Sequence, residues 1–137
     1  MRAVVDVNVL ISGVLSASGY SAEVLRACRD GQFDLLVSET LLSELERALA
    51  YPKLRARIPE DDAAAFVDWV RQHGHLADDP ASPPPIGSRD PDDDYLLAIA
   101  IDHRAYLVTG DQDLLVLGSD FPILTPAQFA TELRGSR

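Results

Sequence analysis

The feature that most limits the fold of this chain is an alternation of short apolar runs with longer amphipathic runs. The short runs are rich in Val, Ile and Leu, which is typical of buried parallel strands. The longer runs repeat apolar residues every three or four positions, as helices that cover a sheet do. A chain that alternates in this way folds as a parallel sheet with helices on both faces. The sequence predicts an α/β protein, a single three-layer α/β/α domain over residues 1–137 with about five central strands.

The boundaries of the expected elements follow from turn and capping residues. The expected strands are residues 2–7, 33–37, 75–77, 106–109 and 121–124. The expected helices are residues 22–29, 38–50, 59–73, 93–102 and 112–117, with a terminal helix that opens at Pro126. Residues 78–89 contain several prolines, so we expect them to form an irregular surface loop.

Composition narrows the cellular setting of the chain. No apolar run approaches the ~20 residues that a membrane-spanning helix needs, and the amino terminus lacks the pattern of a signal peptide. Cys28 is the only cysteine, which excludes an internal disulfide and a zinc site made of several thiolates. We therefore expect a cytoplasmic protein with no membrane partner.

The charge balance raises a question about partners. The chain has 22 Asp and Glu residues against 12 Lys and Arg, a formal net charge of −10. A charge of this sign repels a bare polyanion such as nucleic acid. The alternative is that many of the carboxylates gather in one place and bind cations.

The positions of the acidic residues favour this alternative. Ligands bind to an open parallel sheet outside the carboxyl ends of its strands. Asp6 ends the first expected strand, Asp111 follows the fourth, and Glu44 lies within the helix that could face them. A run of aspartates leads into the helix at 93–102 and comprises Asp90, Asp92, Asp93 and Asp94. Carboxylates that lie close together need a cation to stay ionised, and their hard oxygen atoms suit Mg²⁺ or Mn²⁺.

Each acid also has a purely structural interpretation. The aspartates around Asp93 complement a helix dipole, Asp111 fits a turn and N-cap, and Glu44 fits a solvated helix face. Asp6 is harder to explain in this way, because it lies between Val5 and Val7 and risks burial without a partner. The set as a whole favours a metal site.

Four segments resemble the motifs of PIN-domain ribonucleases, in the same order and over nearly the whole chain. They are V-V-D-V-N-V-L-I-S at 4–12, S-E-T-L-L-S-E-L-E-R-A-L at 38–49, R-D-P-D-D-D-Y-L-L-A-I-A at 89–100 and L-V-T-G-D-Q-D-L-L at 107–115. The resemblance implies that the catalytic metal ligands are Asp6, Glu44, Asp93 and Asp111, with Asp113 as an auxiliary acid. Asp94 is the alternative to Asp93 as third ligand, and Asn8, Asp90 and Asp94 are candidates to orient the ligands.

The resemblance also implies a reaction and partners. The closest branch is similar to the VapC toxins of bacterial toxin–antitoxin pairs, so we expect metal-dependent cleavage of single-stranded or structured RNA, a cognate antitoxin protein and a homodimer. The charge of −10 agrees with a basic antitoxin segment. The only dense basic stretch, Arg47, Lys53, Arg55 and Arg57, fits either an RNA-binding track or a solvated helix end.

Three other functions were compared with this hypothesis. A response-regulator receiver domain needs a late lysine, but Lys53 is the only lysine and lies in the first half of the chain. An aspartate-based phosphatase favours Asp-x-Asp after the first strand, where this chain has Asp6-Val7-Asn8. A non-catalytic protein-binding module on the same fold stays open, although the complete acid set speaks against it.

Overall fold

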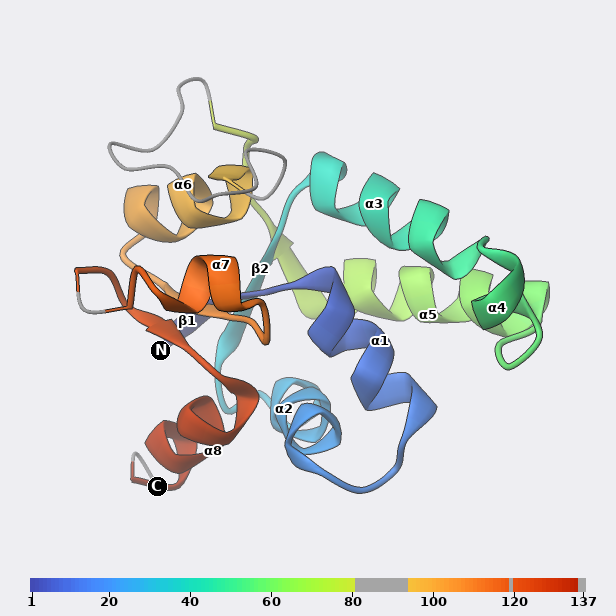
Figure 1. Cartoon of the computed structure of the whole chain (residues 1–137), viewed down its shortest axis with the longest axis horizontal. Coiled ribbons are helices and arrows are strands. Elements are labelled where there is room, and N and C mark those ends of the chain that lie inside the picture. Colours follow the sequence, from blue (N-terminus) through green and yellow to red (C-terminus); the bar gives the residue numbers. More distant parts are fainter. Residues whose placement is uncertain (81–93, 119, 136–137) are drawn as a thin grey trace.

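The computed structural model describes residues 1–80, 94–118 and 120–135, and its centre is a parallel sheet of five strands (Figure 1). The strands are β1 (Arg2–Val5), β2 (Asp34–Val37), β3 (Gly74–Leu76), β4 (Tyr106–Val108) and β5 (Ile123–Leu124). Their order in the sheet is β3-β2-β1-β4-β5, and every neighbouring pair is parallel. The predicted α/β fold with about five parallel strands is confirmed.

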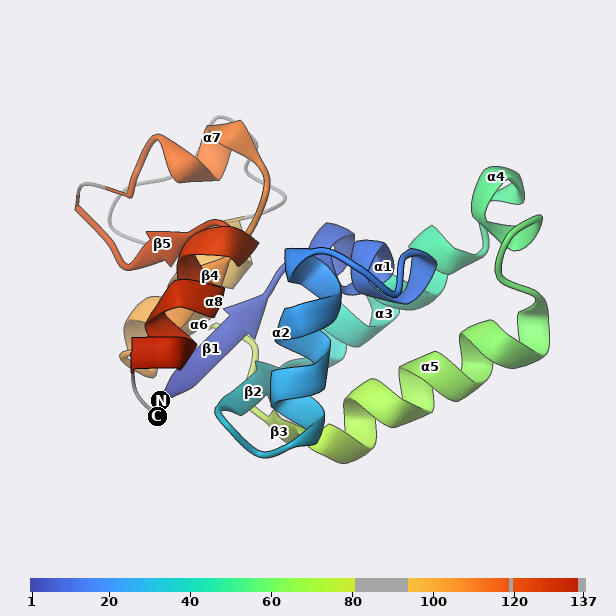
Figure 2. The same ribbon diagram turned by 90° about the horizontal axis from the view of Figure 1, so that it is seen from below.

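Helices cover both faces of this sheet, which gives the predicted three layers. In the described residues they are α1 (Val7–Leu15), α2 (Tyr20–Arg29), α3 (Glu39–Leu49), α4 (Pro52–Arg55), α5 (Glu60–His73), α6 (Asp94–Asp102), α7 (Gln112–Leu115) and α8 (Pro126–Gly135). Helices α2 and α8 pack side by side on one face, while α6 packs against β1 and β4 on the other (Figures 1 and 2). Helix α5 packs against β2 and β3. None of the helices in these residues is long and apolar enough to span a membrane.

The order of the strands creates a crevice beside β1. The chain moves outward from β1 through β2 to β3, then crosses back to β4 on the other side of β1. Connections therefore leave β1 and β4 in opposite directions, and the carboxyl ends of these two strands flank a topological switch point. Ligands of open parallel sheets bind at such points.

The first strand is shorter than the sequence predicted, and a helix replaces its end. We expected a strand over 2–7, but β1 ends at Val5 and α1 begins at Val7. Asp6 is the N-cap of α1: its carboxylate accepts a hydrogen bond from Asn8 N, and its carbonyl accepts one from Leu10 N. Val7, which the prediction placed in the strand because it is β-branched, is the first residue of α1 and lies on its buried face. The short α4 was likewise not predicted, and the expected loop lies outside the described residues from position 81 onward.

Phe129 of α8 gives a test of this core. Its side chain is fully buried and packs edge-on against Phe33, with ring centroids 5.0 Å apart, and against Tyr106 of β4. We expect Phe129→Ala to lower the free energy of unfolding by about 3–5 kcal/mol, because it leaves a cavity between α8 and the sheet. Urea unfolding followed by circular dichroism measures the change. Phe129→Leu keeps most of the apolar volume and should lose much less, so equal losses in the two variants would contradict this role.

Candidate active site

The site is built around Asp6, the residue between β1 and α1. Its side chain is only 5% exposed, and its backbone N–H donates to the carbonyl of Val108 at 2.9 Å. This bond joins the ends of the two strands that flank the switch point. The fold therefore fixes the Asp6 carboxylate in the crevice where α/β proteins bind ligands.

Hydrogen bonds hold both carboxylate oxygens of Asp6. Thr109 Oγ1 donates to Oδ2 at 2.8 Å, and Asn8 N donates to Oδ1 at 3.4 Å. Burial nevertheless raises the pKa of the Asp6 carboxyl above its ordinary value, and the nearby charge of Asp111 raises it further. The hydrogen bonds from Thr109 and from the Asn8 and Val7 amides act in the opposite direction. A carboxylate in this position gains from a cation close by.

Thr109 connects Asp6 to the acids after β4. Its side chain is buried, and its hydroxyl oxygen accepts a hydrogen bond from Asp111 N at 3.0 Å. Asp111 in turn caps α7, since its Oδ1 accepts from Asp113 N at 2.9 Å. Sequence analysis did not single out Thr109, although a hydroxyl at the end of an apolar strand is a signal that could have been noticed.

Glu44 comes from α3, whose sequence sets its orientation. Ser38 caps this helix, and its buried stripe is formed by Leu41, Leu42, Leu45 and Leu49. Glu44 is partly buried, and its Oε2 accepts a hydrogen bond from the hydroxyl of Tyr95 at 2.7 Å. Tyr95 lies in the first turn of α6, so this bond joins α3 to the helix that begins at Asp94. No local pattern marks Tyr95, because its partner lies 51 positions away.

Asp6 and Glu44 meet in one groove. It has a volume of about 230 Å³. Its lining residues are Asp6, Val7, Asn8, Glu44, Arg47, Ala48 and Tyr51. Asp6, between β1 and α1, and Glu44 of α3 therefore line a common space. Asn8 is exposed beside them, in a position to orient a ligand.

The described residues contain part of the predicted ligand set. Asp90 and Asp93 lie outside them, and Asp94 opens α6. Within residues 1–80, 94–118 and 120–135, no three Asp, Glu, His or Cys side chains are close enough to hold a metal ion by themselves. In the same residues neither Asp6 nor Asp111 pairs with Lys, Arg or His. The donors present are hard carboxylate oxygens, and this chemistry fits Mg²⁺ or Mn²⁺.

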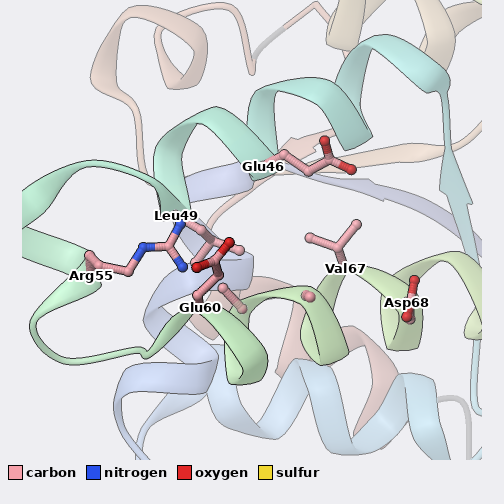
Figure 3. A pocket seen from close by; sticks show the side chains of 8 residues that line it. Glu46, Leu49, Arg55, Glu60, Val67 and Asp68 are labelled. Carbon is pink, nitrogen blue, oxygen red and sulfur yellow. The ribbon is translucent and has the colours of Figure 1, made fainter.

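The predicted basic track is divided between two places. Arg47 lines the groove of Asp6, whereas Arg55 lines a separate pocket between α3 and α5 (Figure 3). This second pocket has an apolar floor and acidic neighbours, among them Glu46, Glu60 and Asp68. The Nη1 atom of Arg55 is buried there and has no hydrogen-bond partner among the described residues. Lys53 and Arg57 are exposed, and neither lines either space.

Comparison with known families identifies the fold and its motifs. Residues 2–113 match the family described as PIN domain. The chain belongs to the PIN domain family. PIN domains are nucleases, that is, hydrolases of phosphodiester bonds. The matched region includes the groove and the segment from Thr109 to Asp113.

Known proteins resemble this PIN domain over most of its length. The uncharacterised protein MJ1680 of Methanocaldococcus jannaschii is 24% identical over 117 residues, which is 85% of this chain and 75% of that protein. The structure of PAE2754 from Pyrobaculum aerophilum has a TM-score of 0.64 at 17% identity, and covers 98% of this chain and 96% of its own. The structure of VapBC2 from Rickettsia felis, bound to a DNA fragment from its promoter, has a TM-score of 0.61 at 14% identity, with 91% and 97% covered. At these identities the structures establish a shared fold.

The raised pKa of Asp6 predicts how the metal-free PIN domain responds to Asp6→Asn. The asparagine can still accept the hydrogen bond from Thr109 but carries no buried charge. A carboxyl whose pKa is raised in the folded state costs stability progressively as the pH rises above its ordinary value, and the full cost is present above the raised pKa. In EDTA at pH 7 to 8 we therefore expect Asp6→Asn to unfold at a higher urea concentration than wild type. The difference should shrink as the pH falls toward the ordinary carboxyl value, 3.8. A variant less stable than wild type throughout this range would contradict the cost of burial.

The bond between Tyr95 and Glu44 is open to a separate test. Tyr95→Phe removes the hydroxyl donor and leaves the ring in place. We expect a loss of about 1.5 kcal/mol in the free energy of unfolding, the lower end of the range for a hydrogen bond to a charged group. Tyr20→Phe, at a half-exposed tyrosine of α2, is the matched control and should change nothing. Equal stabilities of Tyr95→Phe and wild type would show that the bond adds nothing to the fold.

Proposed function

We propose that this protein is a divalent-metal-dependent endoribonuclease. The observation that carries the proposal is the Asp6 carboxylate, buried at the switch point, held by Thr109 and facing the same groove as Glu44. Asp111 lies close enough to raise the pKa of Asp6. A cation relieves the mutual repulsion of such carboxylates, and the family is one of nucleases.

The residues of the chain have distinct roles in this proposal. Those that hold the metal are Asp6, Glu44, Asp93 and Asp111, with Asp113 as an auxiliary ligand. Bound Mg²⁺ or Mn²⁺ supplies the Lewis acid that activates water and offsets the charge developing on the phosphate. Thr109 fixes the rotamer of Asp6, and Tyr95 fixes that of Glu44. Asn8, Asp90 and Asp94 orient the ligands from outside.

We further propose that the chain is the toxin of a toxin–antitoxin pair. Three points support this: the motifs that resemble VapC, the fold shared with VapBC2 of Rickettsia felis, and a charge of −10 that suits a basic partner segment. A toxin of this kind acts in the cytoplasm, as a homodimer that an antitoxin holds inactive. The resemblance alone supports the homodimer.

An RNA cleavage assay tests the nuclease directly. Purified wild type and Asp6→Asn are incubated with end-labelled single-stranded RNA, with a structured RNA and with DNA of matching sequence, in Mg²⁺, in Mn²⁺ and in EDTA. We expect wild type to cut RNA only when metal is present. We expect at least a hundredfold slower cleavage by Asp6→Asn, on the order of the loss when a charge-stabilising group is removed from an active site.

Further assays of the same two proteins distinguish the other functions. Equal cleavage by the two proteins would indicate a contaminating nuclease. Failure of wild type to bind Mn²⁺ in a titration calorimeter, together with no cleavage, would favour a non-catalytic protein-binding module. Release of phosphate from a phosphoaspartyl intermediate would favour the aspartate-based phosphatase.

A further inference from the structure

We propose that Arg47 and Tyr51 form a binding site for one unpaired nucleotide, immediately beside the carboxylates of Asp6 and Glu44. This inference rests on the proposed function and adds the form of substrate that the site accepts. Tyr51 stacks on the base, and Arg47 contacts the adjacent phosphate. The following observations carry the inference.

Four residues at the end of α3 and just beyond it line the same groove. Glu44, Arg47 and Ala48 stand at positions i, i+3 and i+4, which share one side of the helix, and Tyr51 follows the end of α3 as the extended N-cap residue of α4. All four line the groove that Asp6 and Asn8 reach from the other side. The small side chain of Ala48 leaves open space between the arginine and the tyrosine. A strand that places a phosphate near Asp6 and Glu44 therefore extends past Arg47 and Tyr51.

Tyr51 presents its ring to solvent from a fixed backbone. Its side chain is 67% exposed, the largest value among the large hydrophobic residues that the structure describes. Its N–H donates to Ala48 O at 3.3 Å, and its carbonyl accepts from Leu54 N at 3.0 Å and from Arg55 N at 2.9 Å. Tyr51 is also the N-cap of α4, with Pro52 next to it. Because the backbone is already ordered, a base that stacks on this ring orders little more than the side chain.

Arg47 supplies a positive charge at the rim of the groove. Among the residues described, three arginines pair with acids: Arg29 with Asp30, Arg71 with Glu39 and Arg134 with Glu23; of the described arginines that do not, Arg47 is the one that lines this groove. Arg47 is exposed and forms no ion pair in the same part of the chain. In a protein of charge −10, a guanidinium left unpaired at the rim of an acidic groove fits a phosphate.

The geometry of stacking sets the specificity. In a duplex both faces of each base are covered by neighbouring base pairs, so a paired base cannot lie on the Tyr51 ring. Proteins that read single strands stack splayed bases on aromatic side chains in this way. The site therefore favours unpaired RNA, either a single strand or a loop, over a helix. The stacking face and the guanidinium do not themselves read the identity of the base.

The test uses a short uridine-rich RNA that contains one 2-aminopurine, whose fluorescence falls when it stacks on an aromatic ring. Binding is measured with the full chain carrying Asp6→Asn in Mg²⁺, so that the strand stays intact. We expect binding to quench the fluorescence. Adding Tyr51→Ala should abolish the quenching and weaken affinity by about tenfold, within the range for loss of one stacked base. Tyr51→Phe should restore both, and Tyr20→Ala, at the half-exposed tyrosine of α2, should change neither.

Arg47 is tested by salt dependence rather than by quenching. Arg47→Gln should reduce the slope of log affinity against log salt concentration by about 0.7, the value for one phosphate contact to a single strand. Quenching by Tyr51 should persist in this variant. Arg104→Gln, at an exposed arginine after α6, is the matched control and should leave the slope unchanged.

The outcomes separate this site from the proposed activity. If wild type cleaves RNA in a metal-dependent way, but adding Tyr51→Ala to Asp6→Asn changes neither binding nor quenching, the nucleotide site is overturned and the nuclease stands. If Tyr51→Ala loses quenching and affinity while wild type cleaves nothing, the site stands and the proposed activity fails. If Tyr51→Ala weakens binding of a short arginine-rich peptide and leaves RNA binding unchanged, the groove takes a protein partner and the nucleotide site is overturned.

Discussion

The rest of the structure depends on how Asp6 is held between β1 and β4. Its backbone N–H bonds to Val108, its carboxylate accepts from Thr109, and its capping of α1 turns the chain from strand to helix. These contacts close the crevice at the switch point and place a charge inside it. The groove shared with Glu44 follows, because α1 and α3 pack together along the side where Asp6 emerges.

The burial of Asp6 places its carboxylate in the groove and at the same time lowers the stability of the metal-free fold. Burial raises the pKa of Asp6, so the metal-free fold bears a cost at neutral pH that an apolar or amide side chain would avoid. Such costs persist where the site needs them, because selection acts on activity once the fold is stable enough. Asp111 has two effects, because its side chain caps α7 and its charge raises the pKa of Asp6. Each of these two acids caps a helix and also belongs to the proposed metal site.

Sequence analysis anticipated the features that have a local or periodic signal. The alternation of strands and helices, the helix expected over 38–50 and the terminal helix that opens at Pro126 are of this kind, and the structure has them. It missed α1, because β-branched residues continue on both sides of Asp6 and only the hydrogen bond to Asn8 N reveals the cap. Tyr95 was missed for another reason: its contact with Glu44 is made by packing α6 near α3, which no local pattern records. The division of the basic stretch followed from α4, a turn of helix that carries Arg55 away from Arg47.

The net charge of the chain does not describe the electrostatic field in this groove, because dissolved salt screens distant charges. At physiological ionic strength the field of an exposed group fades within about 8 Å. A strand in the groove therefore responds mainly to Asp6, Glu44, Arg47 and any bound cation, and little to the remote acids of α5 such as Asp61 and Asp62. Several remote carboxylates are moreover already paired with arginines, among them Glu23 and Glu39. The net charge of −10 therefore says little about the groove, where the alternation of Glu44 and Arg47 along α3 sets the local field.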